Sequence, residues 1–121
     1  MDQKSTLVVG ASPEPSRYSH MATLRLVGAG HPVVLLGKRA GSIAGLPILR
    51  ELDPSTAIHT ITLYVAPAHQ GGLIEDLLAL RPARIIFNPG TENPRFEAEA
   101  RQRGIEVVEG CTLVMLASGQ F

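Results

Sequence analysis

Small, polar and basic residues gather directly after the first apolar segment of this chain. The segment from Leu7 to Val9 is followed within ten positions by Gly10, Ala11, Ser12, Pro15, Arg17 and Ser19. Where a strand, a turn of small residues and a helix follow one another, exposed backbone N–H groups and the helix dipole favour a bound anion. Arg17 adds a fixed positive charge beside that turn. The spacing predicts a phosphate site of the kind that holds a nucleotide-type cofactor.

The turn after the second apolar segment bears on which nucleotide is held there. The segment Val33–Leu36 is followed by Gly37, Lys38 and Arg39. An NAD site needs an acidic side chain near this point to accept from the ribose 2′-hydroxyl, whereas Lys and Arg suit a phosphate on the ribose. The first turn also departs from the G-x-G-x-x-G fingerprint, because Ser12 and Pro15 stand at its second and third glycine positions. These departures favour a ligand with a phosphorylated ribose, either coenzyme A or NADP.

Three later turns combine small and polar residues in the same way. They contain Val65, Ala66 and Pro67, then Asn88, Pro89 and Gly90, and finally Cys111 and Thr112. Ligands of open α/β folds bind outside the carboxyl ends of the strands, so we expect each turn to form one wall of the site. The serines are interpreted as helix caps and phosphate donors, since no G-x-S-x-G elbow and no acid–histidine pair accompanies them. The four histidines show no ligand spacing, so we predict no catalytic residue and no metal.

Length and composition limit the class of protein. The 121 residues fit one domain, spanning 1–121, with a single core. Eleven basic and eleven acidic residues give zero net charge, and two Tyr, three Phe and no Trp leave little for base stacking, so we expect no nucleic-acid partner. Apolar runs are far shorter than the roughly 20 residues of a membrane span. The single cysteine and the absence of a signal-peptide pattern predict a cytoplasmic protein without an internal disulfide.

Apolar segments alternate with helical patterns along the chain. Strands are expected at Thr6–Val9, Val33–Leu36, Ile61–Val65, Arg84–Phe87 and Glu106–Val108. Helices are expected from Tyr18 until Gly28 and Gly30 end the first one, from Leu73 to Arg81 and from Asn93 to Gly104, and the apolar tail 111–116 fits a helix or a strand, of which we favour the helix. The third helix has a thin apolar stripe and should be largely exposed, and residues 43–48 should form a turn with a short edge strand. This alternation predicts an α/β, three-layer Rossmann-like fold with a mostly parallel five-stranded sheet of order 3-2-1-4-5.

With these motifs the chain resembles the small stand-alone CoA-binding proteins, Rossmann-fold domains similar to the nucleotide-binding part of succinyl-CoA synthetase α subunits. The resemblance covers essentially the full length. It rests on Val-x-Gly-Ala-Ser-x-x-Pro-x-Arg-x-Ser at 8–19, Asn-Pro-Gly-Thr-Glu-Asn at 88–93 and Cys-Thr-Leu-Val-Met-Leu at 111–116. It implies that CoA binds with its diphosphate on the first turn, at residues 10–12, 17 and 19. The adenosine end would lie near 37–39 and 65–67, and the pantetheine arm would run toward 88–90 and 111–112.

The resemblance also indicates what is missing. The synthetase subunits catalyse through a phosphorylated histidine in a further domain and need a second subunit, and no histidine here lies in a Gly-rich loop of that kind. We therefore expect a protein that binds CoA or an acyl-CoA without catalysis of its own, with a homodimer or a partner enzyme subunit left open. Two alternatives are an NADP(H)- or NAD(H)-binding redox-responsive regulator and an accessory fragment of an acyl-CoA ligase. Cys111 is either a small buried apolar residue or, as a separate hypothesis, the partner of CoA in a mixed disulfide.

Overall fold

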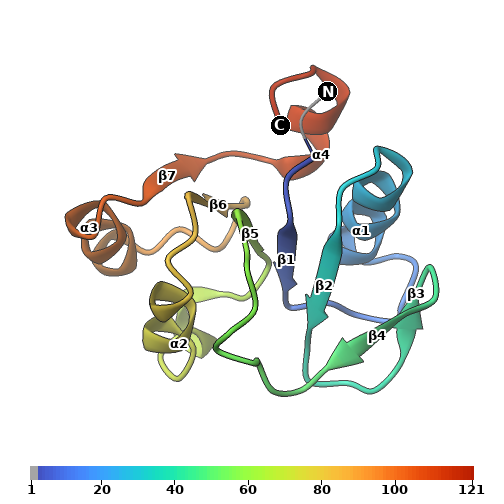
Figure 1. Ribbon diagram of the computed structural model, residues 1–121, viewed down its shortest axis with the longest axis horizontal. Coiled ribbons are helices and arrows are strands. Elements are labelled where there is room, and N and C mark those ends of the chain that lie inside the picture. Colours follow the sequence, from blue (N-terminus) through green and yellow to red (C-terminus); the bar gives the residue numbers. More distant parts are fainter. Residues whose placement is uncertain (1–2) are drawn as a thin grey trace.

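A mostly parallel sheet runs through the molecule, with helices packed against both of its faces (Figure 1). The computed structural model describes residues 3–121. In chain order the strands are β1 (Thr6–Val9), β2 (Val33–Leu36), β3 (Ser42–Ile43), β4 (Leu46–Leu49), β5 (Thr60–Leu63), β6 (Arg84–Phe87) and β7 (Glu106–Glu109). The helices are α1 (Tyr18–Gly28), the short 3₁₀ helix η1 (Pro67–His69), α2 (Ile74–Ala79), α3 (Pro94–Gln102) and α4 (Thr112–Ala117). The α/β class predicted from the alternating pattern is confirmed.

The sheet has seven strands within residues 3–121, so the prediction of five was wrong. Its order is β3-β4-β2-β1-β5-β6-β7, and every neighbouring pair is parallel except β3 with β4. The third predicted strand, at residues 61–65, corresponds to β5. The predicted order 3-2-1-4-5 was also wrong for this strand, because β5 pairs with β1 along its whole length instead of lying beside β2. The place beside β2 is taken by β4, where the buried Ile48 is paired with the buried Leu35.

The two additional strands form a hairpin whose turn carries no strong sequence signal. Ala44 and Gly45 connect β3 to β4, with φ values of 53° and 80°. Two left-handed residues are what a tight hairpin needs, and Asn-Gly or Gly-Gly is the usual sequence that indicates it. An alanine in the first position conceals that signal. A strand is present within the expected residues as β4, but it does not lie at the edge of the sheet, because β3, which was not anticipated, pairs with its outer side.

Two hydrophobic clusters fill the space on either side of the sheet. Along β1, Leu7 and Val9 belong to one cluster and Val8 belongs to the other, since successive strand side chains point to opposite faces. The first cluster is covered by α2 and α3, with Phe96 fully buried, and the second is covered by α1 and α4, with Leu26 fully buried. Strands with apolar side chains on both faces therefore have a helical layer on each face.

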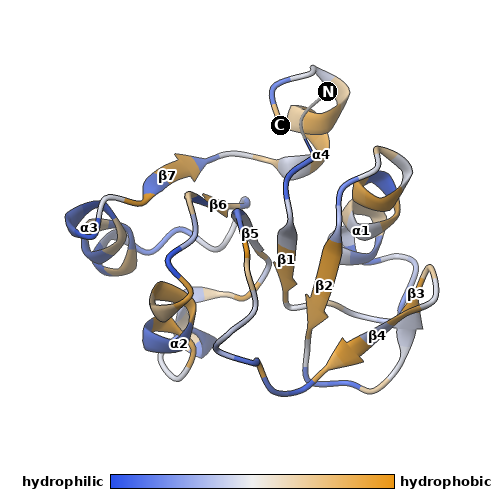
Figure 2. Cartoon of the chain, in the orientation of Figure 1, coloured by the Kyte–Doolittle hydropathy of each residue, from blue (hydrophilic) through white to orange (hydrophobic). Residues whose placement is uncertain are grey.

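The helix ends follow the expected local signals. Asn93 caps α3, because its side chain accepts the Phe96 N–H at 3.2 Å, and α1 ends at Gly28. The predicted helix in the tail is present as α4. As its thin stripe indicated, α3 buries Phe96, Glu97 and Ala100 and is otherwise hydrophilic (Figure 2). No helix within residues 3–121 is long and apolar enough to cross a membrane.

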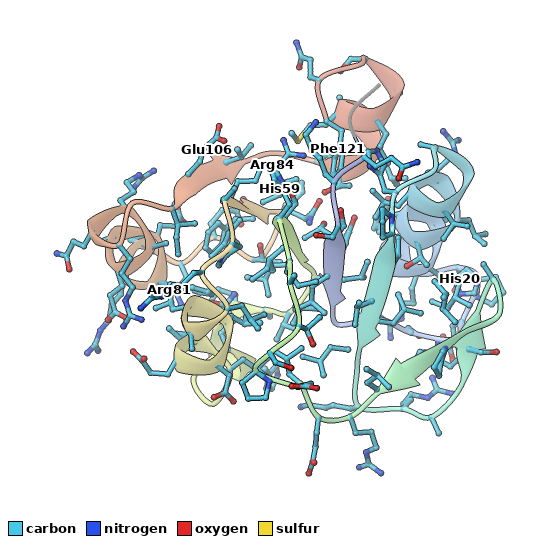
Figure 3. All side chains as sticks on the ribbon, viewed as in Figure 1. His20, His59, Arg81, Arg84, Glu106 and Phe121 are labelled. Carbon is cyan, nitrogen blue, oxygen red and sulfur yellow. The ribbon has the colours of Figure 1, made fainter. Side chains whose placement is uncertain are left out.

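Basic and aromatic side chains gather at the amino end of the sheet. The Phe121 ring lies 5.0 Å from the His31 ring, measured between centroids, and 4.4 Å from the Arg84 guanidinium. His59 and Arg84 lie beside Phe121 in Figure 3. His31 Nδ1 accepts the backbone N–H of Lys4 at 3.0 Å. Because a protonated ring nitrogen donates and cannot accept, this contact requires a neutral His31.

The free energy of unfolding should therefore fall when the pH drops below about 6.5. Burial lowers the pKa of both His31 and His59, and the nearby charges of Lys4 and Arg84 lower both further. A histidine with a depressed folded pKa takes up protons more readily in the unfolded chain. Its contribution to stability is thus intact above its ordinary pKa of about 6.5 and is lost as the pH falls toward its folded pKa.

Thermal melts recorded from about pH 7.5 down to about pH 5 would measure this effect. The Tm of the wild type should fall with pH, and the fall should be smaller for His31→Asn. The asparagine side chain has an oxygen that can accept the Lys4 N–H but does not titrate. Equal slopes for the two proteins would contradict the assignment of the pH dependence to His31.

Candidate functional site

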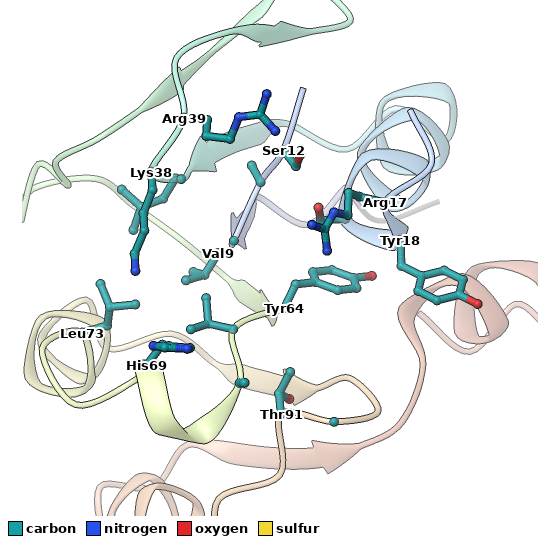
Figure 4. Close-up of a pocket in the computed structure, with 18 of the residues that line it drawn as sticks. Val9, Ser12, Arg17, Tyr18, Lys38, Arg39, Tyr64, His69, Leu73 and Thr91 are labelled. Carbon is teal, nitrogen blue, oxygen red and sulfur yellow. The ribbon is translucent and has the colours of Figure 1, made fainter. Parts of the chain in front are cut away.

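A cleft of about 910 Å³ opens at the carboxyl ends of the central strands (Figure 4). Its volume falls within the range of about 300–1,000 Å³ typical of small-molecule sites. Its walls are the turns after β1, β2, β5 and β6, together with the start of α1. The cleft is lined by Val9, Gly10, Ala11, Ser12, Arg17, Tyr18, Ser19, Leu36, Gly37, Lys38, Arg39, Arg50, Tyr64, Val65, Ala66, His69, Gly72, Leu73, Pro89, Gly90 and Thr91.

Two glycines allow three of these turns to pack backbone to backbone. Gly10 has a φ of 93°, and a Cβ at this position would lie 3.1 Å from both the carbonyl carbon and the oxygen of Tyr64. A Cβ on Gly37 would overlap the carbonyl oxygen of Ala11. The turns after β1, β2 and β5 thus meet beneath the cleft because two positions carry no side chain.

The amide groups of the first turn are only partly available to a ligand. The N–H groups of Gly10 and Ala11 both donate to the Leu36 carbonyl at 2.9 Å. These two amides are therefore engaged within the protein, because the turn closes onto the end of β2. Among the residues between positions 10 and 19 that line the cleft, the N–H groups without a hydrogen-bond partner are those of Ser12, Tyr18 and Ser19. Two of the three belong to the first turn of α1, where the helix dipole is positive.

Four basic side chains surround the cleft. They are Arg17, Lys38, Arg39 and Arg50, and none of the residues that line the cleft is an aspartate or a glutamate. Arg17 and Lys38 lie on opposite sides of the opening in Figure 4. Because the whole chain has zero net charge, the cleft concentrates positive potential at one place on the surface.

Glu14 lies next to the cleft and partly neutralises this charge. One of its oxygens accepts a hydrogen bond from Arg39 at 3.0 Å, and the other lies 3.9 Å from Arg17 Nε. The Arg39 guanidinium is the main cause that lowers the pKa of Glu14, so the carboxylate is charged at neutral pH. All three side chains are exposed, and such pairs are weak and screened by salt. A bound anion would compete with Glu14 for both guanidinium groups.

Replacing Glu14 with glutamine should therefore strengthen the binding of an anionic ligand by about two- to fivefold. The gain should be larger at low ionic strength, because the competing charges are exposed. Titration calorimetry at two salt concentrations would measure it. Glu99→Gln is a matched control, since Glu99 pairs with the exposed Arg95 on α3 and does not line the cleft. An affinity for Glu14→Gln no higher than that of the wild type would exclude this competition.

Most of the residues expected to bind the cofactor line the cleft. They are Gly10, Ala11, Ser12, Arg17, Ser19, Gly37, Lys38, Arg39, Val65, Ala66, Pro89 and Gly90. Five others do not line it, namely Pro15, Pro67, Asn88, Cys111 and Thr112. Pro15 is exposed ahead of α1, and Pro67 begins η1. The roles of all these residues toward a ligand stay predictions.

Asn88 is occupied within the protein. Its Nδ2 donates to Thr62 Oγ1 at 2.8 Å and to the Leu63 carbonyl at 2.9 Å, and its Oδ1 accepts the Thr112 N–H at 2.9 Å. The hydroxyls of Thr62 and Thr112 also bond to each other at 2.8 Å. With 2% of its surface exposed, Asn88 joins the start of α4 to β5 and β6. Its side chain positions the wall behind the cleft and is not free to hold a pantetheine arm.

Several lining residues were not among those expected to bind. They are Val9, Tyr18, Leu36, Arg50, Tyr64, His69, Gly72, Leu73 and Thr91. Val9 and Leu36 are the last residues of β1 and β2, so the rule that ligands bind at carboxyl ends could have found them. Arg50 directly follows β4, a strand that its sequence only weakly indicated. Its place beside the cleft depends on the pairing of β4 with β2.

Residues 3–121 show no metal site, and Cys111 lies outside the lining of the cleft. Across the part of the chain that the structure describes, no group of three or more His, Cys, Asp or Glu side chains is placed to hold a metal ion. Cys111 is half-buried at the N-cap of α4 and does not line the cleft. The mixed disulfide between Cys111 and CoA stays a prediction.

Comparison with known proteins shows which family this sequence matches. Residues 4–117 match the family described as CoA binding domain. The chain is similar to an uncharacterized protein of known crystal structure, with 42% identity over 100% of both chains and a TM-score of 0.97. It is also similar to a protein from Thermus thermophilus, with 25% identity over 98% of this chain and 91% of that chain and a TM-score of 0.86.

A hypothetical protein from Pyrococcus horikoshii OT3 has the same fold, with 23% identity over 96% of this chain and 82% of that chain and a TM-score of 0.84. None of the curated proteins matches this sequence.

Proposed function

This chain belongs to the CoA binding domain family, and we propose that it holds coenzyme A or an acyl-CoA in the cleft at the carboxyl ends of β1, β2 and β5. The observation that supports this most strongly is the set of four basic side chains around a cleft without a carboxylate. Coenzyme A carries a diphosphate and a separate ribose phosphate, so its charges complement two groups of cations. Charge-assisted hydrogen bonds to phosphate are among the strong ones in proteins.

The diphosphate is proposed to lie at the start of α1. The unpartnered N–H groups of Ser12, Tyr18 and Ser19 can donate to its oxygens, and the N-cap residue Arg17 makes no side-chain cap that would block them. This differs from the cradle expected from the sequence, because the Gly10 and Ala11 amides are already bonded. In the proposed arrangement these two residues give close packing and the neighbouring amides give the hydrogen bonds.

The ribose phosphate is proposed to lie near the turn after β2. Lys38, Arg39 and Arg50 come from the ends of β2 and β4, which are neighbours in the sheet. Arginine can bind a phosphate through two parallel hydrogen bonds, whereas lysine acts as a compact point charge. The apolar part of the lining, which includes Val9, Leu36 and Leu73, is suited to the uncharged parts of the ligand.

The proposal is binding without catalysis. His69 lines the cleft, but no carboxylate in the lining is available to orient it as a general base. The serines at positions 12 and 19 lie in the turn after β1 and at the start of α1, where they suit phosphate contacts. A second candidate is an NADP(H)-binding regulator, which the three cations near β2 also favour, since they would suit a 2′-phosphate as well as a 3′-phosphate.

A panel of thermal shifts with CoA, acetyl-CoA, dephospho-CoA, NADPH, NADH and ATP would test the proposal. A ligand present at about 100 times its Kd adds about 2.7 kcal/mol, which corresponds to several degrees for a domain of this size. CoA and acetyl-CoA should give the largest shifts, and dephospho-CoA should give a smaller one because it lacks the ribose phosphate. Stabilisation by NADPH without any shift by CoA would replace this proposal with the NADP(H) alternative.

A further inference from the structure

Gln70 joins two walls of the cleft from behind. It directly follows η1, is fully buried and does not itself line the cleft. Its Nε2 donates to the carbonyl oxygens of Val65 and Thr91, each at 2.8 Å. Val65 lies in the turn after β5 and Thr91 in the turn after β6, and both residues line the cleft. One buried side-chain amide therefore connects two separate turns of the cleft.

The orientation of the Gln70 amide is set by Asn93. The Asn93 Oδ1 caps α3 by accepting the Phe96 N–H, so the Asn93 Nδ2 is the group left to face Gln70. This Nδ2 donates to the Gln70 Oε1 at 2.8 Å. Because the oxygen of the Gln70 amide accepts from Asn93, its nitrogen is turned toward the two carbonyl groups. The cap of α3 thus decides, through two side-chain amides, which end of Gln70 faces the walls.

This arrangement keeps two peptide oxygens out of the cleft. Since Gln70 is fully buried behind the lining, the carbonyl oxygens that bond to it point into the protein and away from the opening. A buried carbonyl that loses its donor is costly and would turn toward water, which it can reach in the cleft. Thr91 lies across the cleft from Arg39 in Figure 4. Released carbonyl oxygens on this wall would carry partial negative charge toward an anionic ligand.

We propose that Gln70 is a positioning residue for the anionic ligand, which holds the turns after β5 and β6 together with their carbonyl oxygens withdrawn from the cleft. The inference rests on the proposed function and assigns to ligand binding a residue that does not contact the ligand. Asn93 shares this role, because it orients Gln70. Substitutions that disturb the pair should therefore weaken ligand binding even where the protein stays folded.

Calorimetric titration of CoA into Gln70→Met would measure the first effect. Methionine has a similar length and shape but no donor, so the Val65 and Thr91 carbonyls lose their partner. The Kd for CoA should rise by about tenfold or more, and the Tm of the unliganded variant should fall by several degrees. Gln102→Met makes the same chemical change at an exposed position outside the cleft, and it should leave both the Kd and the Tm unchanged.

Two substitutions of Asn93 separate the orientation of Gln70 from the stability of α3. Aspartate and serine both cap helices, and neither has the Nδ2 donor. Aspartate places an oxygen opposite the Gln70 Oε1, so the Gln70 amide must turn around and direct its own oxygen at the two carbonyls. Serine is too short to oppose Gln70 in this way. Asn93→Asp should therefore weaken CoA binding by about tenfold, and Asn93→Ser by only about two- to threefold.

The difference between the two Asn93 variants should persist at about 0.5 M salt, where the long-range effect of the added charge is screened. This comparison decides the question even if Gln70→Met does not fold. If Gln70→Met is destabilised but binds CoA as the wild type does, Gln70 is only structural and the positioning role is wrong, while CoA binding stands. Equal losses for Asn93→Asp and Asn93→Ser would also reject the proposal. If the wild type does not bind CoA, the proposed function itself fails.

Discussion

Replacing Arg17 and Lys38 together with methionine should lower the affinity for CoA by a hundredfold or more. A hydrogen bond to a charged group contributes about 1.5–3 kcal/mol, so two such contacts correspond to about 3–6 kcal/mol. Both side chains line the cleft, but the Arg17 side chain is 68% exposed, and solvent screening favours the lower end of that range. About 3 kcal/mol is already more than a hundredfold in Kd.

The measurement is a calorimetric titration of CoA into the double variant and into a matched control. Arg95→Met/Arg103→Met removes the same number of charges at exposed positions outside the cleft, where the two arginines pair with Glu99 and Glu75. The control has the same net charge as the double variant, but it should bind CoA as the wild type does, because the two charges that it loses lie outside the cleft. If both double variants lose affinity equally, the effect is one of overall charge, and the assignment of Arg17 and Lys38 to the phosphates is wrong.

The sheet could be predicted where the segments are apolar on both faces and could not where they are half-exposed. β1, β2 and β6 were predicted with the bounds that they have. A strand between two helical layers is a nearly continuous apolar run, and such a run is easy to recognise in a sequence. β3 and β4 carry exposed residues such as Pro47 and Leu49, so their sequence indicated only a turn with a short edge strand. Their pairing depends on burial of Ile43 and Ile48 against the rest of the second cluster, which is a tertiary effect.

The candidate site could be predicted at the level of its turns. Each predicted strand end carries small residues, and the topology brings four of those turns to one cleft. Which groups are free within a turn was beyond sequence reasoning. Gly10 and Ala11 have the expected residue types, yet the Leu36 carbonyl takes both of their N–H groups. Asn88 looked accessible in its turn but is buried by contacts with Thr112, a residue 24 positions away.

The surroundings of the Tyr64 side chain could not be predicted from the sequence either. Its position directly after a buried strand indicates a place near the cleft, but a tyrosine there is most simply interpreted as an amphipathic residue with its hydroxyl in water. Its hydroxyl is instead buried close to the hydroxyls of Thr62 and Thr112, which bond to each other. Such a contact depends on the α4 start being held against β5, and no local pattern reports it.

Replacing Gly37 with alanine should destabilise the protein by about 2–4 kcal/mol and abolish most ligand binding. The added Cβ would overlap the Ala11 carbonyl oxygen and lie 3.0 Å from Ile48 Cγ2. Neither neighbour is the end of a flexible chain. Ala11 is fixed by the bond from its N–H to Leu36, and Ile48 lies on β4, which holds the Gly37 N–H through Leu49 at 2.9 Å. Two movements could relieve the overlap. Either the turn after β1 shifts away from β2, or β4 separates from β2.

Either movement displaces a wall of the cleft, so stability and affinity should fall together. Thermal melts should show a Tm lower by about 10 °C, and calorimetry should show CoA binding weakened by more than about tenfold. Gly71→Ala is the matched control, because it makes the same chemical change where no atom lies within 4 Å of the added carbon. Its Tm should stay within about 2 °C of the wild type. A Gly37→Ala protein that melts like this control would mean that the turns after β1 and β2 can move apart at little cost. The close packing of these two turns beneath the cleft would then not be needed for stability.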